Sequence, residues 1–257
     1  MNNTVEKIRN TSLFVILALW LQGKWPRAFF FILRKIYHKK DRHFFIAKML
    51  AKKDKNSPIY FVQVGAFDGV SGDPLHRYIS YHRWNGILVE PQKLYYKKLK
   101  KVYKKYSNLH FVRAAVAPQE GEATLYSIKN SESRDLPVWA SQIASFDLNL
   151  ILSHTDQIPN IEGHIQEEVV PTVPLMSLIK KSKFDEIDVV QVDVEGYDFE
   201  VLKMINFNKI KPQLIRFEHK HLSKKDQKKA EDMLERKDYT LFENGGDTLA
   251  VSESLID

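Results

Sequence analysis

The chain has 257 residues, a formal net charge of +7 and no cysteine. A chain of this length can form one substantial domain with a buried core and a short appendage, but it is short for two independent domains. The absence of cysteine excludes disulfides, thiolate-bound zinc and a thiol nucleophile.

The positive charge is concentrated near the N-terminus. Residues 1–55 hold thirteen Lys and Arg against three Asp and Glu, which is +10, so the rest of the chain sums to −3. The net positive charge of the chain therefore does not indicate a nucleic-acid surface on the main domain. A run of lysines within residues 93–105 is typical of a solvated helix face, with attraction to an anionic acceptor as the alternative. We expect no nucleic-acid partner.

Residues 1–56 are predicted to form a basic, apolar helical arm. Its two apolar runs are separated by Lys24, Pro26 and Arg27, and neither reaches the roughly 20 residues that a membrane-spanning helix needs. Aromatic residues beside Lys and Arg in residues 10–40 are typical of a segment lying on anionic lipid. Under this hypothesis we expect a cytoplasmic protein that binds peripherally to the inner face of the membrane. The alternative is that the arm packs on the main domain or on a second subunit of a homo-oligomer.

Residues 57–257 alternate short strands with helices, which predicts a sheet with right-handed parallel crossovers. The expected strands cover residues 59–64, 84–90, 109–116, 121–126, 184–193 and 213–218, and a hairpin of 239–243 and 248–252 closes the chain. The expected helices cover residues 70–81, 92–106, 197–204 and a segment that starts at a Ser223 cap. Residues 129–168 are polar and less regular, and we interpret them as an excursion over the site.

A glycine-containing loop, Gly65 to Gly69, directly follows the first strand. The missing Cβ atoms let the backbone turn sharply and approach a ligand. The loop lacks both the third glycine of a dinucleotide-binding motif and the lysine of a P-loop, so a compact adenosyl ligand fits better than a dinucleotide. The same glycines also suit a tight turn without a ligand. Asp68 could bind the cofactor's amino acid end or cap the following helix.

Two later strand ends complete the predicted cofactor site. Glu90 ends the second strand, where Pro91 stops it, and its carboxylate can accept hydrogen bonds from both ribose hydroxyls. The third strand carries Ala114 and Ala115, which are small enough for an adenine ring to lie against. The alternative for these alanines is packing under a helix.

Five segments, in this order, resemble the FkbM-type methyltransferases, a family of O-methyltransferases with a class I, Rossmann-like fold: residues 61–69, 86–91, 141–147, 190–200 and 216–222. The resemblance implies a mostly parallel seven-stranded sheet with a C-terminal antiparallel hairpin, and S-adenosylmethionine as cofactor. The expected cofactor-binding residues are Gln63, Gly65, Ala66, Asp68, Gly69, Glu90, Pro91, Ala114, Ala115, Ser145 and Asp193. Gln63 stands where many class I enzymes carry an acid, which predicts weaker charge pairing with the cofactor's ammonium.

Methyl transfer to a neutral hydroxyl needs an aligned oxygen and a base. The candidates are Asp193, Glu195, Glu218, His219 and His221, which all stand at the carboxyl ends of two strands. Histidine titrates near neutral pH, although a histidine beside a strand end is often structural, and Glu195 could instead cap the next helix. Asp193 and Glu195 could hold a divalent cation, but further oxygen ligands are not evident, so we expect a metal-free mechanism.

The resemblance implies a hydroxyl acceptor on a sugar of a cell-surface glycan, lipopolysaccharide or glycolipid. Two hypotheses of other classes stay open from the sequence. One is a non-catalytic, membrane-associated scaffold, which the intact glycine and acidic positions disfavour. The other is a nucleotide-dependent oxidoreductase, which the closing hairpin and the absent third glycine disfavour.

Overall fold

The structure is a computed structural model that describes residues 46, 49, 53, 57–129 and 136–256. Residues 1–45, which hold most of the predicted arm, lie outside the described residues, so contact of the arm with lipid or with a second subunit stays a prediction. Within the described part of the chain, no helix combines the length and apolar character needed to cross a bilayer.

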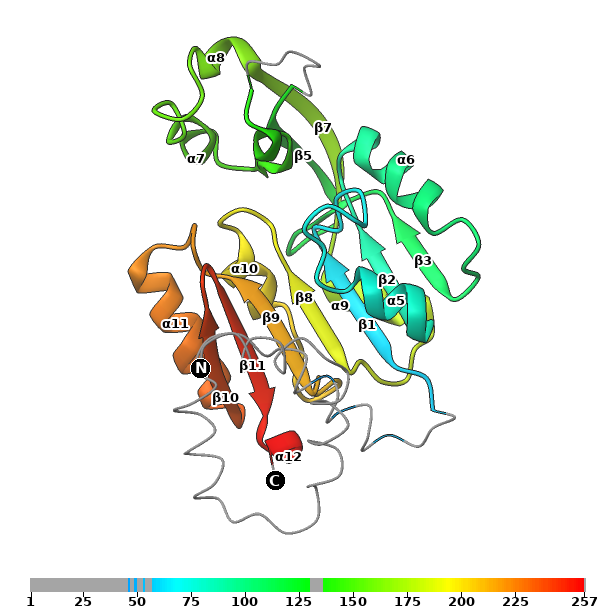
Figure 1. Cartoon of the computed structure of the whole chain (residues 1–257). Coiled ribbons are helices and arrows are strands. Elements are labelled where there is room, and N and C mark those ends of the chain that lie inside the picture. Colours follow the sequence, from blue (N-terminus) through cyan, green and yellow to red (C-terminus); the bar gives the residue numbers. More distant parts are fainter. Residues whose placement is uncertain (1–45, 47–48, 50–52, 54–56, 130–135, 257) are drawn as a thin grey trace, which may run out of the picture.

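A seven-stranded sheet with the order β10-β11-β9-β8-β1-β2-β3 forms the centre of the domain (Figure 1). Its parallel strands are β1 (Tyr60–Val64), β2 (Asn85–Val89), β3 (Leu109–Val112), β8 (Val189–Val192) and β9 (Leu214–Glu218). β10 (Tyr239–Asn244) and β11 (Asp247–Ser252) form the closing hairpin, in which β11 runs antiparallel to both neighbours. The predicted mostly parallel sheet with a C-terminal antiparallel hairpin is confirmed.

Helices cover both faces of this sheet. One face packs on α9 (Leu175–Ser182), α10 (Asp198–Lys203) and α11 (Lys224–Glu235). The other packs on α5 (His76–His82), α6 (Lys93–Val102) and α12 (Glu253–Ile256). Alternation along the strands explains the division, because Val62 and Val64 belong to the first core cluster and Phe61 to the second. The buried Ile46 and Met49 also join the second cluster, so the end of the predicted arm packs on the domain.

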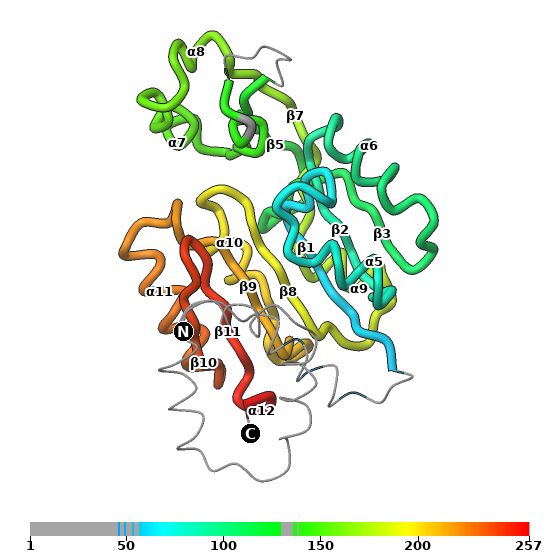
Figure 2. Tube along the Cα trace, in the orientation of Figure 1, coloured from blue at the N-terminus to red at the C-terminus, as the bar shows by residue number. Residues whose placement is uncertain are grey.

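A second sheet, of order β4-β7-β5-β6, projects beyond the large sheet (Figures 1 and 2). Its strands are β4 (Ala115–Val116), β5 (Gly121–Ile128), β6 (Ala144–Ser145) and β7 (Ile165–Val173). Three short helices accompany it: η1 (Val138–Gln142), α7 (Leu148–Leu152) and α8 (Ile161–His164). The single strand predicted over residues 109–116 is therefore wrong, since β3 lies in the large sheet and β4 in the small one.

Two further differences from the predicted elements have local causes. The helix expected over residues 70–81 begins only at His76, because Gly72 has a φ of +69°, which no α-helix can include. β7 begins inside the segment expected to be irregular. The sequence does not indicate this strand, because Glu167 and Glu168 interrupt its apolar pattern. The strand forms because it pairs with β5, and the hydrophobic pattern of the sequence does not reveal this pairing. The predicted Ser223 cap is confirmed, because its side chain accepts a hydrogen bond from the Asp226 N–H.

Candidate active site

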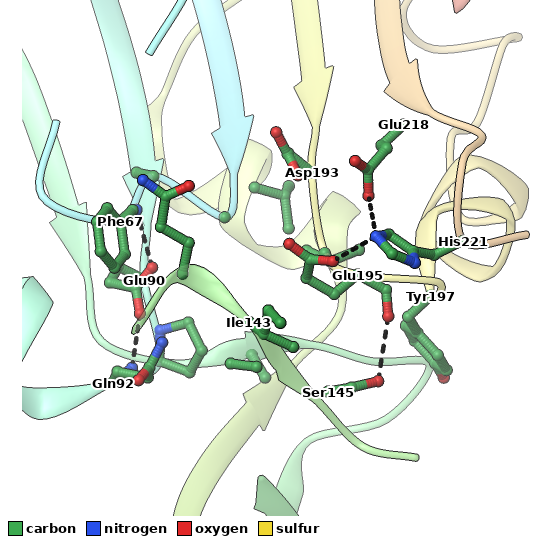
Figure 3. Close-up of a pocket in the computed structure, with 18 of the residues that line it drawn as sticks. Phe67, Glu90, Gln92, Ile143, Ser145, Asp193, Glu195, Tyr197, Glu218 and His221 are labelled. Atoms are coloured by element: carbon green, nitrogen blue, oxygen red, sulfur yellow. Dashed lines mark hydrogen bonds and ion pairs between the residues drawn. The ribbon is translucent and has the colours of Figure 1, made fainter. Parts of the chain in front are cut away.

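A cavity of about 430 Å³ lies at the carboxyl ends of β1, β2, β8 and β9, with η1 and β6 of the excursion as a further wall (Figure 3). Glu90 and the acidic side chains after β8 and β9 lie on opposite sides of this cavity. The predicted cofactor residues that line it are Gln63, Gly65, Ala66, Glu90, Pro91, Ala114, Ala115, Ser145 and Asp193. Segments far apart in the sequence therefore meet at the sheet edge where open α/β folds bind ligands.

The loop after β1 is shaped by contacts within the protein. Gly65 has a φ of +81°, and a Cβ at this position would lie 1.9 Å from the backbone oxygen of Asp193. The close approach of two strand ends therefore requires this glycine even without a ligand. Gly69 does not line the cavity, and its carbonyl accepts a hydrogen bond from the Tyr103 hydroxyl at 2.9 Å. The loop residues that line the cavity are Gly65, Ala66 and Phe67.

Asp68 also stays outside the cavity. Its carboxylate accepts hydrogen bonds from the backbone N–H groups of Val70 and Ser71 and from the Ser71 hydroxyl, at 2.7–2.9 Å. These bonds lower the pKa of Asp68, although burial opposes them. These bonds stabilise the turn after Asp68 and do not cap the following helix, which begins only at His76, so of the two roles that the sequence leaves open the capping one is not observed and contact with the cofactor stays a prediction.

Glu90 is the most buried acid facing the cofactor side of the cavity, with 3% of its surface exposed. Its Oε2 accepts a hydrogen bond from the Phe67 N–H at 2.9 Å, and its Oε1 accepts one from the Gln92 N–H at 2.8 Å. Burial raises the pKa of Glu90 from 4.5 to about 7 in spite of these two bonds. The carboxyl is thus held rigidly, and each oxygen keeps a lone pair for a ribose hydroxyl.

We expect Glu90→Gln to remove a pH-dependent part of the stability. Because the folded-state pKa is raised, the Glu90 contribution is full below about pH 4.5 and is lost as pH rises through about 7. Between pH 5 and 8 the free energy of unfolding of the wild type should fall relative to that of the variant, by up to about 3 kcal/mol. Urea unfolding of both proteins at several pH values measures this difference, and parallel pH profiles would contradict the assignment.

Gln63 and Asp73 form a polar pair beside the glycine loop. Gln63 Nε2 donates to Asp73 Oδ1 at 3.1 Å, and the Leu75 N–H donates to the same oxygen at 2.8 Å. Gln63 Oε1 and Asp73 Oδ2 are both buried and have no hydrogen-bond partner. The sequence prediction missed Asp73, whose only local signal is its place before a proline just after the loop. Asp73 therefore places a carboxylate beside Gln63, which stands where many class I enzymes carry an acid.

Ser145 connects the excursion to the large sheet. Its hydroxyl donates to the backbone oxygen of Glu195 at 3.1 Å and accepts from the Asp147 N–H at 3.2 Å. Ala114 and Ala115 lie at the point where the chain passes from one sheet to the other, and are 5% and 7% exposed. They line the cavity, and both also belong to core clusters.

The candidate catalytic side chains form a cluster at the ends of β8 and β9. His221 Nε2 lies 3.1 Å from Glu195 Oε2 and 3.8 Å from Glu218 Oε2. Asp193 lies nearby, with its Oδ2 3.8 Å from Arg216 Nη1. Glu195 has a φ of +48°, a conformation that is uncommon for a residue with a side chain and is concentrated at functional sites.

Burial dominates the electrostatics of this cluster. It raises the pKa of Glu195 to about 9 and that of Glu218 to about 7, and neighbouring carboxylates add to both shifts. Burial also lowers the pKa of His221 to about 4, helped by Lys220 and His154, so its imidazole is neutral at pH 7. Asp193 has a raised pKa for the same main reason, which Arg216 opposes.

His219 requires a change to the predicted catalytic set. It lies outside the cavity, where its Nδ1 is 2.8 Å from the Thr248 hydroxyl. The N–H groups of His219 and Lys220 both donate to the Gly246 carbonyl, and the turn that follows brings His221 back to the cavity. Of the two candidate histidines, His221 therefore lines the cavity and His219 does not.

The strand order and the strand-end cavity define a class I methyltransferase-like fold. Residues 63–241 match the family model described as the methyltransferase FkbM domain, and the chain belongs to this family. The protein is accordingly a methyltransferase that depends on S-adenosylmethionine. The resemblance stated from the sequence motifs is confirmed.

Other comparisons give distant similarity. No curated protein matches the chain. Among solved structures, it is similar to the N-terminal domain of human METTL16 in complex with S-adenosylhomocysteine (SAH), at 13% identity and a TM-score of 0.44, covering 86% of this chain and 70% of that one. It is also similar to the methyltransferase FkbM from Methylobacillus flagellatus, at 12% identity and a TM-score of 0.43, covering 79% of this chain and 47% of that one.

Proposed function

We propose that the protein is an O-methyltransferase that methylates a hydroxyl group of a sugar in a cell-surface glycan, lipopolysaccharide or glycolipid. The observation that carries this proposal is the cluster of Asp193, Glu195 and Glu218 in the same cavity as the glycine loop. Carboxylates accept hydrogen bonds from hydroxyls and can remove their protons, whereas an acceptor with an acidic proton would not need them.

The cavity residues fit S-adenosylmethionine, which supplies an electrophilic methyl group on its sulfonium. Glu90 is suited to the ribose hydroxyls, because its rigid carboxyl retains free acceptor capacity. The unpartnered oxygens of Gln63 and Asp73 suit the positively charged ammonium of the cofactor's amino acid end. Ala114 and Ala115 leave room for the adenine ring.

We expect Asp73→Asn to weaken SAH binding by about tenfold or more, because a charge-assisted hydrogen bond contributes about 1.5–3 kcal/mol. The amide would keep the approximate shape of the side chain but not its charge. Calorimetric titration with SAH measures the effect. The matched control is Asp238→Asn, the same change at an exposed position paired with Lys211. Equal affinity of both variants would contradict a role for Asp73.

Asp193 is the residue that we assign as the base. Its backbone oxygen lies against Gly65, so it joins the acidic cluster to the glycine loop, and it lines the cavity. S-adenosylmethionine, when bound, would supply the methyl group to the acceptor oxygen, and Asp193 would take the hydroxyl proton. Glu195, Glu218 and His221, in the same cluster, would hold the acceptor beside Asp193.

The sugar assignment is supported by aromatic side chains in the cavity wall. Trp139, Phe146 and Tyr197 line the cavity, and the Phe146 and Tyr197 rings meet edge to face at 5.3 Å. Aromatic faces pack against the C–H groups of sugar rings, while carboxylates bind the hydroxyls. Such a mixed wall suits an acceptor with both features.

Labelled-methyl transfer tests the proposal. The full chain is incubated with S-adenosylmethionine carrying a labelled methyl group and with fractionated cell-envelope glycans, and mass spectrometry locates the label. We expect the label on a sugar oxygen. Label on nitrogen or carbon, or binding of the cofactor without transfer to any fraction, would overturn the proposal; the second result would revive the scaffold hypothesis.

A further inference from the structure

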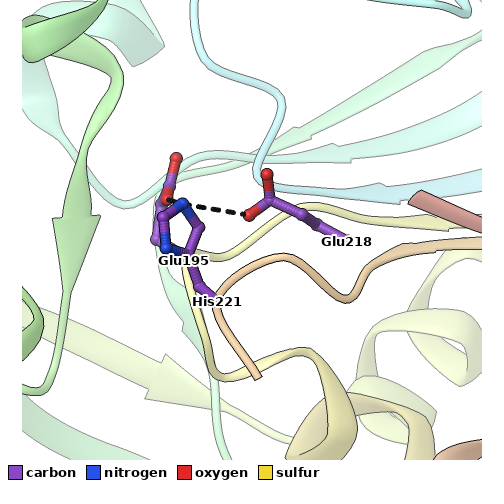
Figure 4. Close-up of side chains that lie close together, drawn as sticks. All are labelled: Glu195, Glu218 and His221. Carbon is purple, nitrogen blue, oxygen red and sulfur yellow. Dashed lines mark ion pairs between the residues drawn. The ribbon is translucent and has the colours of Figure 1, made fainter. Parts of the chain in front are cut away.

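Three side chains from two separate segments converge at one point of the cavity wall (Figure 4). One ligand atom each from Glu195, Glu218 and His221 lies within 4.8 Å of the other two. Ligand atoms bound to one ion at about 2.1 Å lie about 3–4 Å from each other. The two contacts of His221 Nε2, 3.1 and 3.8 Å, fall within this range.

These side chains do not satisfy one another. Glu195 Oε2 and Glu218 Oε2 are buried and have no hydrogen-bond partner, so the short approach of His221 Nε2 to each of them lacks hydrogen-bond geometry. Two buried carboxyl oxygens and an imidazole nitrogen that face one another without hydrogen-bond geometry are suited to sharing one cation.

The charge around the cluster also favours a cation. Behind Glu218 lies Asp198, which is fully buried, accepts from the Glu218 N–H with its Oδ1, and has no partner for its Oδ2. Arg216 is engaged with Asp247 at 2.6 Å and reaches Asp193 only at 3.8 Å. The acids at this end of the sheet therefore exceed the cations that contact them within the described residues.

We propose that Glu195, Glu218 and His221 bind a divalent transition-metal ion. A set of two carboxylates and one imidazole favours Mn²⁺, Fe²⁺ or Zn²⁺ over Mg²⁺ and Ca²⁺, which prefer oxygen ligands alone. The sequence argues against a cation on Asp193 and Glu195 because further ligands are not evident there. The fold supplies them from β9 and from the turn after it.

The role of the ion rests on the proposed function. Facing the cavity, it would bind the acceptor hydroxyl and lower the pKa of that hydroxyl, so that Asp193 could take the proton as the oxygen–methyl bond forms. Asp193 is not one of the three ligands and stays free for this step. Binding of the ion itself does not depend on the methyl-transfer reaction.

Metal titration of the full chain tests the proposal without any acceptor. Calorimetry with Mn²⁺ and with Zn²⁺, together with the electron paramagnetic resonance signal of Mn²⁺, should show one ion bound per chain. Glu218→Gln and His221→Ala should each weaken binding at least tenfold. The controls are Glu200→Gln, the same change on the exposed face of α10, and His110→Ala, at an exposed position on β3; both should bind the ion as the wild type does.

SAH binding and thermal unfolding of each variant establish that it is folded. Absence of binding of both metals to the wild type, or equal binding by the cluster variants and their controls, would overturn the proposal. If SAH binds but neither metal does, the ion site fails while the proposed function stands. If a metal binds at the three ligands but SAH does not, the proposed function fails and the ion site stands.

Discussion

Asp193→Asn is expected to lower the rate of methyl transfer by about 10²- to 10⁴-fold while leaving SAH affinity within about threefold of wild type. The amide retains the shape of the carboxyl but cannot accept the hydroxyl proton at neutral pH. The measurement is turnover with the glycan fraction that accepts label from the wild type, beside calorimetry with SAH.

Asp238→Asn provides the matched control for this prediction. Asp238 has a φ of +64°, which asparagine tolerates, and its only ion pair is the exposed contact with Lys211 within the described residues. This variant should keep wild-type turnover. If Asp193→Asn also keeps it, the base is another group of the cluster, and the assignment to Asp193 is wrong.

Gly65→Ala is expected to destabilise the protein by about 4 kcal/mol or more and to abolish SAH binding. The new Cβ would lie 1.9 Å from the backbone oxygen of Asp193, so β1 and β8 could not keep their present separation. The left-handed φ of +81° adds strain of about 1–2 kcal/mol. Urea unfolding and calorimetry measure the two effects.

Gly72→Ala separates the steric clash of a new Cβ from the strain of the left-handed backbone. Gly72 has a similar φ of +69°, but a Cβ there meets nothing within 4 Å, so only the strain of about 1–2 kcal/mol should remain. Equal destabilisation by the two substitutions would show that strand packing does not require Gly65.

The strands of the large sheet could be predicted because each strand carries a local signal. Continuous apolar runs indicate the buried parallel strands, and Asn244 to Asp247 indicates the hairpin turn. The second sheet could not be predicted in the same way. β7 is partly exposed and carries adjacent acids, so its pairing with β5 depends on contacts distant in sequence.

The sequence predicts which strand ends form the candidate site, but it does not predict which way the side chains there point. Glu90, Asp193, Glu195 and Glu218 line the cavity as expected, because parallel strands end at one edge. His219 does not, since a turn held by the Gly246 carbonyl decides which histidine faces the cavity. Nothing in the local sequence reveals that turn.

We place the methyl donor in the strand-end cavity. A crystal structure of the protein with SAH would show where it binds. We expect the ribose hydroxyls within hydrogen-bond distance of Glu90, the ammonium beside Gln63 and Asp73, and the sulfur facing Asp193. A ligand bound elsewhere, or a ribose that does not contact Glu90, would rule out this placement.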